Sequence, residues 1–303
     1  MRSLNIFVLG LLTCIVLQSC GDDVPRHTDT TAKGTIDISA DETYKPIIEE
    51  QLRVFDSSYP DAHITIHYKP EAECFKDYFD DKARLILVTR DLTPAEKEIC
   101  AQKKVWPSSR ILARDAVAVI VNKESPDSLI GMDALKGILT GVYKTKYTVV
   151  FDNTGSSTVR YINDSILKGS KLGSNVFAAK GNTEVVDYVS KNPKAIGFVG
   201  LSYVSDNNDP NNTGNFINTV RVAAIENDTA KEFILPYQAY IALRSYPLTR
   251  SLYYINSESY QGLGTGFADF LASQRGQLVF FHAHMFPTLA EMVIRAAEVT
   301  NKQ

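Results

Sequence analysis

The strongest constraint on the fold is a regular alternation of strand-like and helix-like segments along the chain. Gly34–Ser39 and Ile64–Tyr68 have the patterns of strands, whereas Pro46–Phe55 repeats its apolar residues at helical spacing. Ala116–Val121 is an uninterrupted apolar run, as expected for a strand covered on both faces. Repeated strand–helix units predict an α/β protein with mainly parallel sheet. Such sheets bind ligands beyond the carboxyl ends of their strands.

The first 33 residues have a different character. Arg2 precedes the apolar run Ile6–Leu17, which is too short to span a bilayer and is typical of a secretory signal peptide. The run leads into Leu-Gln-Ser-Cys, which resembles a bacterial lipobox, so we interpret residues 1–19 as a signal peptide and Cys20 as the lipidated N-terminus. A plain secretory signal is the alternative. Residues 20–33 are polar without periodicity and predict a flexible tether to a bacterial membrane, in the periplasm or at the cell surface.

Composition and motifs argue against several functions. The formal net charge is −3 and there is no basic run, which speaks against nucleic-acid binding. The chain has no G-x-S-x-G or H-E-x-x-H motif and no dinucleotide fingerprint, so we expect no enzymatic activity, no metal and no cofactor. Cys74 and Cys100 are too few for a metal site; in an oxidising compartment they form either a disulfide or two buried thiols.

Two loops that follow predicted strands are candidate anion sites. After the apolar residues 149–151, a small polar loop leads into a helical pattern, and its hydroxyls and helix N–H groups could hold an oxyanion. The hydroxyls concerned are those of Ser156, Ser157 and Thr158. One of them could instead simply cap the helix. In the second loop, Asp91 could accept a proton from an oxyanion and Arg90 could supply positive charge, although an ordinary helix cap explains the same residues.

Several segments, in order along the chain, resemble the phosphate-binding lipoproteins of ABC transporters, within the type II periplasmic binding proteins. The most specific stretch is Tyr246–Ile255, followed by Gly264–Leu271 and Gln274–Gln277. Also similar are Asp115–Asn122, Leu135–Gly141, and Gly181-Asn182 through Ala195–Leu201. The resemblance implies two α/β lobes, each a mostly parallel sheet flanked by helices, with a ligand cleft between them. It places residues 34–113 and about 247–303 in lobe 1, and residues 114–246 in lobe 2.

The resemblance also implies which residues bind the ligand. Of a Ser-Thr pair at a helix start only Thr43 is kept, preceded here by Glu42. The aspartate that accepts a proton from phosphate falls on Asp91, and the Ser-Gly-Thr hydroxyls fall on residues 156–158. A further serine has no counterpart in residues 70–73, and Asp152 stands where the family has an arginine.

These departures have an electrostatic consequence. A phosphate dianion beside Glu42, Glu71 and Asp152 would meet like charge, at a cost on the order of several kcal/mol in a desolvated cleft. Either Arg160, Arg90 or Arg114 compensates, or the acidic side chains point away, or the ligand is not free phosphate.

We therefore expect an extracytoplasmic, lipid-anchored, monomeric protein that captures inorganic phosphate or a similar small oxyanion and delivers it to the permease of an ABC importer. The expected ligand-binding residues are Thr43, Asp91, Ser156, Ser157, Thr158, Arg160 and Arg90. The alternative is a surface or sensory lipoprotein of the same fold that binds a different ligand or a protein partner.

Overall fold

The computed structural model describes residues 28–206 and 215–289. The predicted signal peptide, Cys20 and most of the predicted tether lie outside the described residues. Within them, no helix is both long enough and apolar enough to cross a membrane.

The end of the predicted tether is packed on the domain, which corrects the sequence-based expectation for residues 28–33. The buried carboxylate of Asp29 accepts hydrogen bonds from the Leu263 backbone N–H (2.9 Å) and the Tyr260 hydroxyl (2.8 Å). It also pairs with Arg84 at 2.7 Å. Any flexible tether therefore ends before Asp29, because this buried charge is held by partners on the domain.

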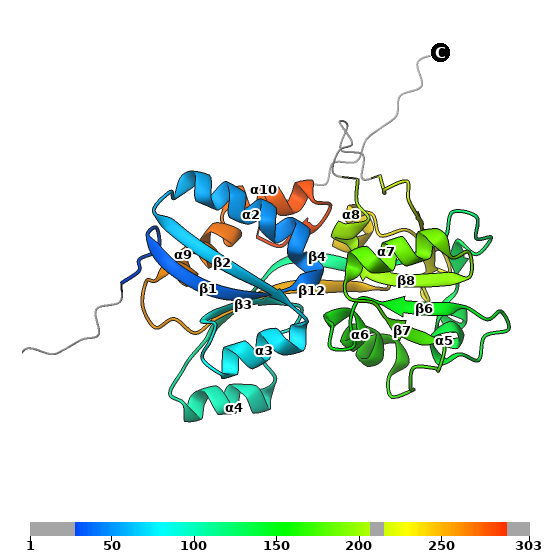
Figure 1. Cartoon of the computed structure of the whole chain (residues 1–303), viewed down its shortest axis with the longest axis horizontal. Helices are drawn as coiled ribbons and strands as arrows, with labels where there is room; N and C mark the ends of the chain where they lie inside the picture. Colours follow the sequence, from blue (N-terminus) through cyan, green and yellow to red (C-terminus); the bar gives the residue numbers. More distant parts are fainter. Residues whose placement is uncertain (1–27, 207–214, 290–303) are drawn as a thin grey trace, which may run out of the picture.

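Two α/β lobes lie side by side and are joined by two crossover strands (Figure 1). The elements of lobe 1 are β1 (Gly34–Asp41), η1 (Glu42–Tyr44), α2 (Lys45–Ser58), β2 (Ala62–Lys69), α3 (Glu71–Phe79), β3 (Leu85–Val88), α4 (Pro94–Gln102), α9 (Leu263–Ala272), α10 (Gln274–His282) and β13 (Phe286–Pro287). The elements of lobe 2 are β5 (Leu129–Ile130), α5 (Met132–Thr140), β6 (Thr148–Phe151), α6 (Ser157–Tyr161), η2 (Ile162–Leu167), β7 (Val176–Ala178), α7 (Asn182–Lys191), β8 (Ala195–Gly200), η3 (Leu201–Tyr203), β9 (Arg221–Val222), β10 (Ala224–Glu226), β11 (Phe233–Ile234) and α8 (Gln238–Ala242). The crossover strands are β4 (Ser108–Val121) and β12 (Thr249–Asn256).

One continuous sheet runs through both lobes. Its path is β2-β1-β3-β12-β4-β8-β6-β7, with β13 and β9 also paired to β4. The outer strands of each lobe pair in parallel, as predicted, whereas β4 and β12 are antiparallel to each other and to their outer neighbours. β4 pairs with β12 along residues 108–116 and with β8 along residues 117–121, so this one strand belongs to both lobes.

Separate hydrophobic cores stabilise the two lobes. Along β4, Leu112 and Ala113 belong to the lobe 1 core, and the run from Ala116 onward belongs to the lobe 2 core. On the return path, Leu248 packs in the lobe 2 core and Leu252 in the lobe 1 core. Each crossover strand therefore has a short gap between the cores, and charged residues occupy these gaps.

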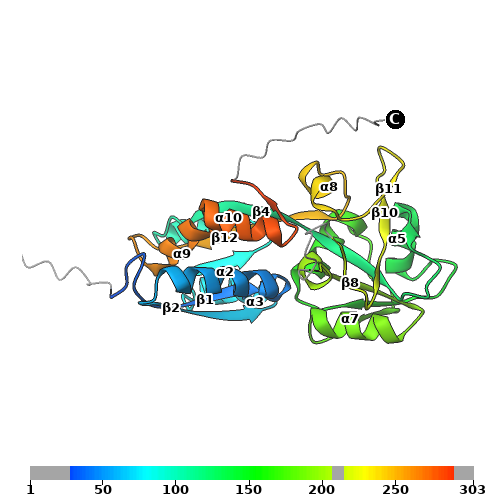
Figure 2. The same cartoon turned by 90° about the horizontal axis from the view of Figure 1, so that it is seen from above.

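Lobe 1 has apolar clusters on both faces of its sheet. Leu85 and Leu87 of β3 face the cluster under α2, α9 and α10, whereas Ile86 and Val88 face a smaller cluster under α3 and α4. Figure 1 shows α2 and α10 on one side of the lobe 1 strands and α3 and α4 on the other, and Figure 2 shows α2 and α10 side by side. Cys74 and Cys100 lie buried in the smaller cluster and are both free. Of the two arrangements left open by the sequence, the structure has the two buried thiols.

Candidate functional site

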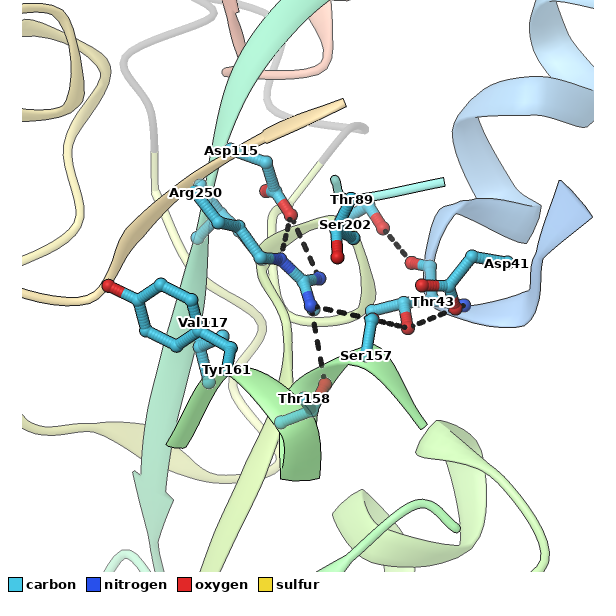
Figure 3. A network of polar contacts seen from close by, with 12 residues as sticks. Asp41, Thr43, Thr89, Asp115, Val117, Ser157, Thr158, Tyr161, Ser202 and Arg250 are labelled. Carbon is cyan, nitrogen blue, oxygen red and sulfur yellow. Dashed lines mark hydrogen bonds and ion pairs between the residues drawn. The ribbon is translucent and has the colours of Figure 1, made fainter. Parts of the chain in front are cut away.

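A buried polar cluster occupies the region where the crossover strands pass between the lobes (Figure 3). Its side chains come from the end of β1 and η1 in lobe 1, from the start of α6 in lobe 2, and from both crossover strands. The cluster thus joins four segments that lie far apart in the sequence.

An ion pair between the crossover strands lies at the centre of this cluster. Arg250 of β12 and Asp115 of β4 are direct neighbours in the antiparallel register, in the gaps between the two cores. Nε and Nη2 of Arg250 donate to Asp115 Oδ2 at 3.1 and 3.0 Å, and both side chains are 2% exposed. Burial by itself lowers the pKa of Arg250, but Tyr44, Asp115 and Asp41 outweigh it and raise the pKa above its ordinary value. Arg250 is therefore a permanently charged cation at the lobe junction.

Hydroxyl groups from both lobes surround the remaining edge of this guanidinium. Arg250 Nη1 donates to Ser157 Oγ at 3.0 Å and to Thr158 Oγ1 at 3.4 Å. The hydroxyl of Thr43, from lobe 1, lies 3.3 Å from that of Ser157 and donates to Asp41 Oδ1 at 2.7 Å. A buried cation beside three hydroxyls can hold a small oxyanion, since each group can donate to an anionic oxygen. We call Thr43, Ser157, Thr158 and Arg250 the anion cradle.

The small polar loop before α6 has both of the roles that its sequence left open. Ser156 is the N-cap of α6, where its Oγ accepts from the Val159 N–H at 3.2 Å. Ser157 and Thr158, the next two residues, turn their hydroxyls toward Arg250 instead. The structure therefore does not bring Ser156 together with Arg250 as it does Ser157 and Thr158, because capping geometry holds its side chain against its own helix.

Replacing Ser156 by alanine should lower the free energy of unfolding by about 1 kcal/mol, the usual cost of losing such a cap. Urea denaturation measures this change. The matched variant Ser157→Ala changes the neighbouring hydroxyl and should lower anion affinity. A Ser156→Ala protein that binds anions more weakly but unfolds at the wild-type urea concentration would contradict the assignment.

Arg160 lies beside the anion cradle but is paired with its own carboxylates. Its Nε donates to Glu71 at 2.5 Å and its Nη1 to Asp164 at 3.2 Å. Glu71, 2% exposed, also accepts from the backbone N–H and the hydroxyl of Thr89 at 2.7 and 2.6 Å. Arg160 therefore neutralises the buried Glu71, so it has little charge left to offset that of a ligand.

Arg90 and Asp91 are not part of the anion cradle, which corrects the sequence-based expectation. Both nitrogens at the end of Arg90 bind Glu96, at 2.7 and 2.8 Å, and its guanidinium lies 3.7 Å from the ring centroid of Phe75. Asp91 pairs with Lys97 at 2.7 Å and accepts from the Leu92 N–H at 2.8 Å. Burial raises the pKa of Asp91, but these partners outweigh it and lower the pKa. Thr89, two residues earlier, bonds with Glu71 and Arg160.

Sequence reasoning missed Arg250 and Asp115, the two charged residues at the centre. Both lie in segments that resemble the family. Neither lies in a loop between a strand and a helix, where the sequence predicts anion-binding residues. The available signal was the position of each charge inside an extended apolar stretch. A charge there needs a buried partner.

Glu42 and Asp152, two of the acidic residues that would meet a phosphate dianion with like charge, lie beside the anion cradle together with Asp41. Burial, with the carboxylate of Glu71, raises the pKa of Asp41 to about 6. Burial, together with Asp152, Asp41 and Glu73, raises the pKa of Glu42 to about 7. Burial also raises the pKa of Asp152, whose Oδ2 accepts from Asn182 Nδ2 at 3.1 Å. Among the described residues, no group of three or more Asp, Glu, His or Cys side chains could hold a metal ion.

Replacing Glu42 by glutamine should raise the free energy of unfolding at pH 8 by about 1–2 kcal/mol and change it little at pH 4. The folded protein holds the Glu42 proton up to about pH 7, whereas the unfolded chain releases it near pH 4.5. The wild-type protein therefore loses stability as the pH rises through this window, and neutral glutamine removes that loss. The Glu42 side chain is half-buried, so solvent screening keeps the change in the free energy of unfolding below the value that the full pKa shift would give.

Urea unfolding at the two pH values tests this prediction, with Glu98→Gln on the exposed face of α4 as the control. An equal effect of Glu42→Gln at pH 4 and pH 8 would show that the carboxylate is not destabilised in the folded state.

Two α/β lobes with a polar cluster between them at the crossover strands define a two-lobed solute-binding protein. A family model described as PBP superfamily domain matches residues 25–275, and the chain belongs to this family. The chain is similar to the phosphate-binding protein PstS of Staphylococcus aureus, with 24% identity over 81% of this chain and 75% of that protein. It is also similar to protein SphX of Synechococcus elongatus, with 23% identity over 60% of this chain and 59% of the length of SphX.

Among solved structures, the chain resembles a Clostridium perfringens protein described as a phosphate ABC transporter substrate-binding protein, crystallised with bound phosphate. The two have a TM-score of 0.70 and 21% identity, over 84% of this chain and 100% of that one. This likeness confirms the predicted fold, the two-lobed α/β architecture of type II periplasmic binding proteins.

Proposed function

We propose that the protein captures inorganic phosphate or a similar small oxyanion in the anion cradle and passes it to the permease of an ABC importer. The observation that carries the proposal is the buried guanidinium of Arg250, whose Nη1 faces the hydroxyls of Ser157 and Thr158. The relatives from S. aureus and C. perfringens, by their names, bind phosphate or serve phosphate transport.

In this proposal Arg250 supplies the charge that the family's arginine, replaced here by Asp152, would supply. Thr43 brings a hydroxyl from lobe 1, and Ser157 and Thr158 bring hydroxyls from lobe 2, so the anion holds the lobes together. The lobes close around the ligand by hinge motion at the crossover strands, and the permease recognises this closed conformation. Asp41, rather than Asp91, accepts a hydrogen bond from the Thr43 hydroxyl of the anion cradle.

Isothermal titration calorimetry of the purified chain with phosphate, and with sulfate as control, tests this function. A cradle bordered by buried carboxylate oxygens favours an oxyanion that carries a proton, so sulfate should bind at least about tenfold more weakly. Heat from neither anion at pH 6 or pH 8 would refute the proposal.

We also propose that the protein is a monomeric, non-enzymatic lipoprotein, anchored outside the cytoplasm through Cys20. The lipobox-like sequence supports the anchor, and the polar stretch after Cys20 gives the domain reach from the membrane. Membrane fractionation of cells that express the wild type or Cys20→Ala tests the anchor: the variant should lose its lipid and leave the membrane fraction.

A further inference from the structure

Three carboxylates besides Asp115 lie next to the anion cradle. Asp41 and Glu42 follow each other at the end of β1 in lobe 1, and Asp152 follows β6 in lobe 2. Asp41 and Asp152 are fully buried, with 0% exposure. Asn182 donates to Asp152 Oδ2 at 3.1 Å, and a Cβ at the preceding residue, Gly181, would lie 3.9 Å from Glu42 Oε2, so Asp152 and Glu42 are near neighbours across the lobe boundary.

Each of these carboxylates has one buried oxygen without a hydrogen-bond partner: Asp41 Oδ2, Glu42 Oε1 and Asp152 Oδ1. The charged and titratable groups around Glu42 are Asp41, Asp152, Glu73 and Tyr203, none of them basic. Arg250, the cation beside them, already binds Asp115. Buried acceptors that lack donors are rare and costly in folded proteins, so three together indicate that a ligand supplies the donors.

We propose that the solute captured by this cleft carries a primary ammonium group as well as its oxyanion, as in an aminoalkyl phosphonate or phosphate ester. This inference rests on the proposed function, since the oxyanion is the part held in the anion cradle. An ammonium has three donor hydrogens and no acceptor, which matches three unpartnered acceptor oxygens. A phosphate ion alone would leave most of these oxygens without donors.

The two subsites are contiguous because Asp41 belongs to both. Its Oδ1 accepts from the Thr43 hydroxyl of the anion cradle at 2.7 Å, while its Oδ2 is one of the three unpartnered oxygens. A short linker between phosphorus and nitrogen is therefore expected to span them. Burial and the neighbouring carboxylates raise the pKa of Glu42, and a bound cation would offset this penalty on its charge.

The test compares three probes by titration calorimetry at pH 8: 2-aminoethylphosphonate, ethylphosphonate, which lacks only the amine, and inorganic phosphate. At this pH an alkylammonium keeps its proton. The wild-type chain should bind 2-aminoethylphosphonate at least about tenfold more tightly than ethylphosphonate, as expected for a charged hydrogen-bond set. Phosphate binding with equal affinities for the two phosphonates would overturn the inference and leave the proposed function standing. No binding of any probe would refute both.

Variants locate the ammonium site. Glu42→Gln and Asp152→Asn should each reduce the preference for the amine to about twofold or less, and each should strengthen phosphate binding because a like charge is gone. Stronger phosphate binding also shows that the variants are folded. Glu98→Gln, an exposed charge on α4, should keep the wild-type preference. An amine preference that survives both cleft substitutions would overturn the assignment.

Discussion

Replacing Arg250 by methionine is expected to abolish phosphate binding and to lower the free energy of unfolding by about 3–5 kcal/mol, the usual cost of leaving a buried charge unpaired. Methionine fills much of the arginine's volume but cannot neutralise Asp115, which is 1% exposed. The variant also removes the cation of the anion cradle. Titration calorimetry measures the first effect and urea denaturation the second.

A double variant separates these two effects. Arg250→Met with Asp115→Leu removes both charges, and replacing a buried ion pair by apolar residues is often neutral for stability. We expect the double variant to regain most of the lost stability and none of the phosphate binding. If phosphate binding returned with the stability, Arg250 would be a structural residue and not the ligand's counter-charge.

Replacing Gly200 by alanine should weaken ligand binding by about tenfold to a hundredfold, in line with the 1–3 kcal/mol cost of overpacking. Gly200 ends β8 in lobe 2 at the point where it meets Thr43 of lobe 1. A Cβ there would lie 2.4 Å from Thr43 Cγ2 and 2.9 Å from the Thr43 carbonyl oxygen. These contacts would push the lobes apart at Thr43, the residue of lobe 1 that contributes a hydroxyl to the anion cradle. Calorimetry with phosphate measures the loss.

Gly155→Ala is the matched control, because this glycine lies in the small polar loop before α6, next to the anion cradle. A Cβ at Gly155 would meet its nearest atoms, Asn153 Oδ1 and Pro70 Cβ, at 3.7 Å, which is ordinary van der Waals contact. It should therefore change affinity little. Equal losses for the two variants would mean that the approach of the lobes at Thr43 is not what limits binding.

Much of the fold was predictable because it depends on local patterns. The run Ala116–Val121 reads as a strand covered on both faces, and all six residues are fully buried in β4. The capping box at Thr93 is also local, and both of its hydrogen bonds are present. The site was only partly predictable. Ser157 and Thr158 were predicted because a polar loop between a strand and a helix is a recognisable pattern, and the structure brings their hydroxyls to Arg250.

Three predicted site residues lie outside the anion cradle for one reason. Ser156, Arg90 and Asp91 have the right chemistry beside the right loops, but a sequence does not state which way a side chain points at a strand end. Ser156 turns to cap its helix, and Arg90 and Asp91 turn to Glu96 and Lys97. Each of these side chains bonds to a partner close by in the sequence. Such a contact closes a shorter loop of chain, so it costs less conformational entropy than a contact across the cleft.

By itself, the sequence determined the α/β architecture, the polar loop before α6 and the resemblance to binding proteins, since each depends on the spacing of neighbouring residues. Only the tertiary structure decided which charge serves the site. Arg250 and Asp115 are separated by 135 positions and meet because two crossover strands pair in one register, in the gap between two cores. That register depends on the packing of both lobes at once, so no local pattern contains it.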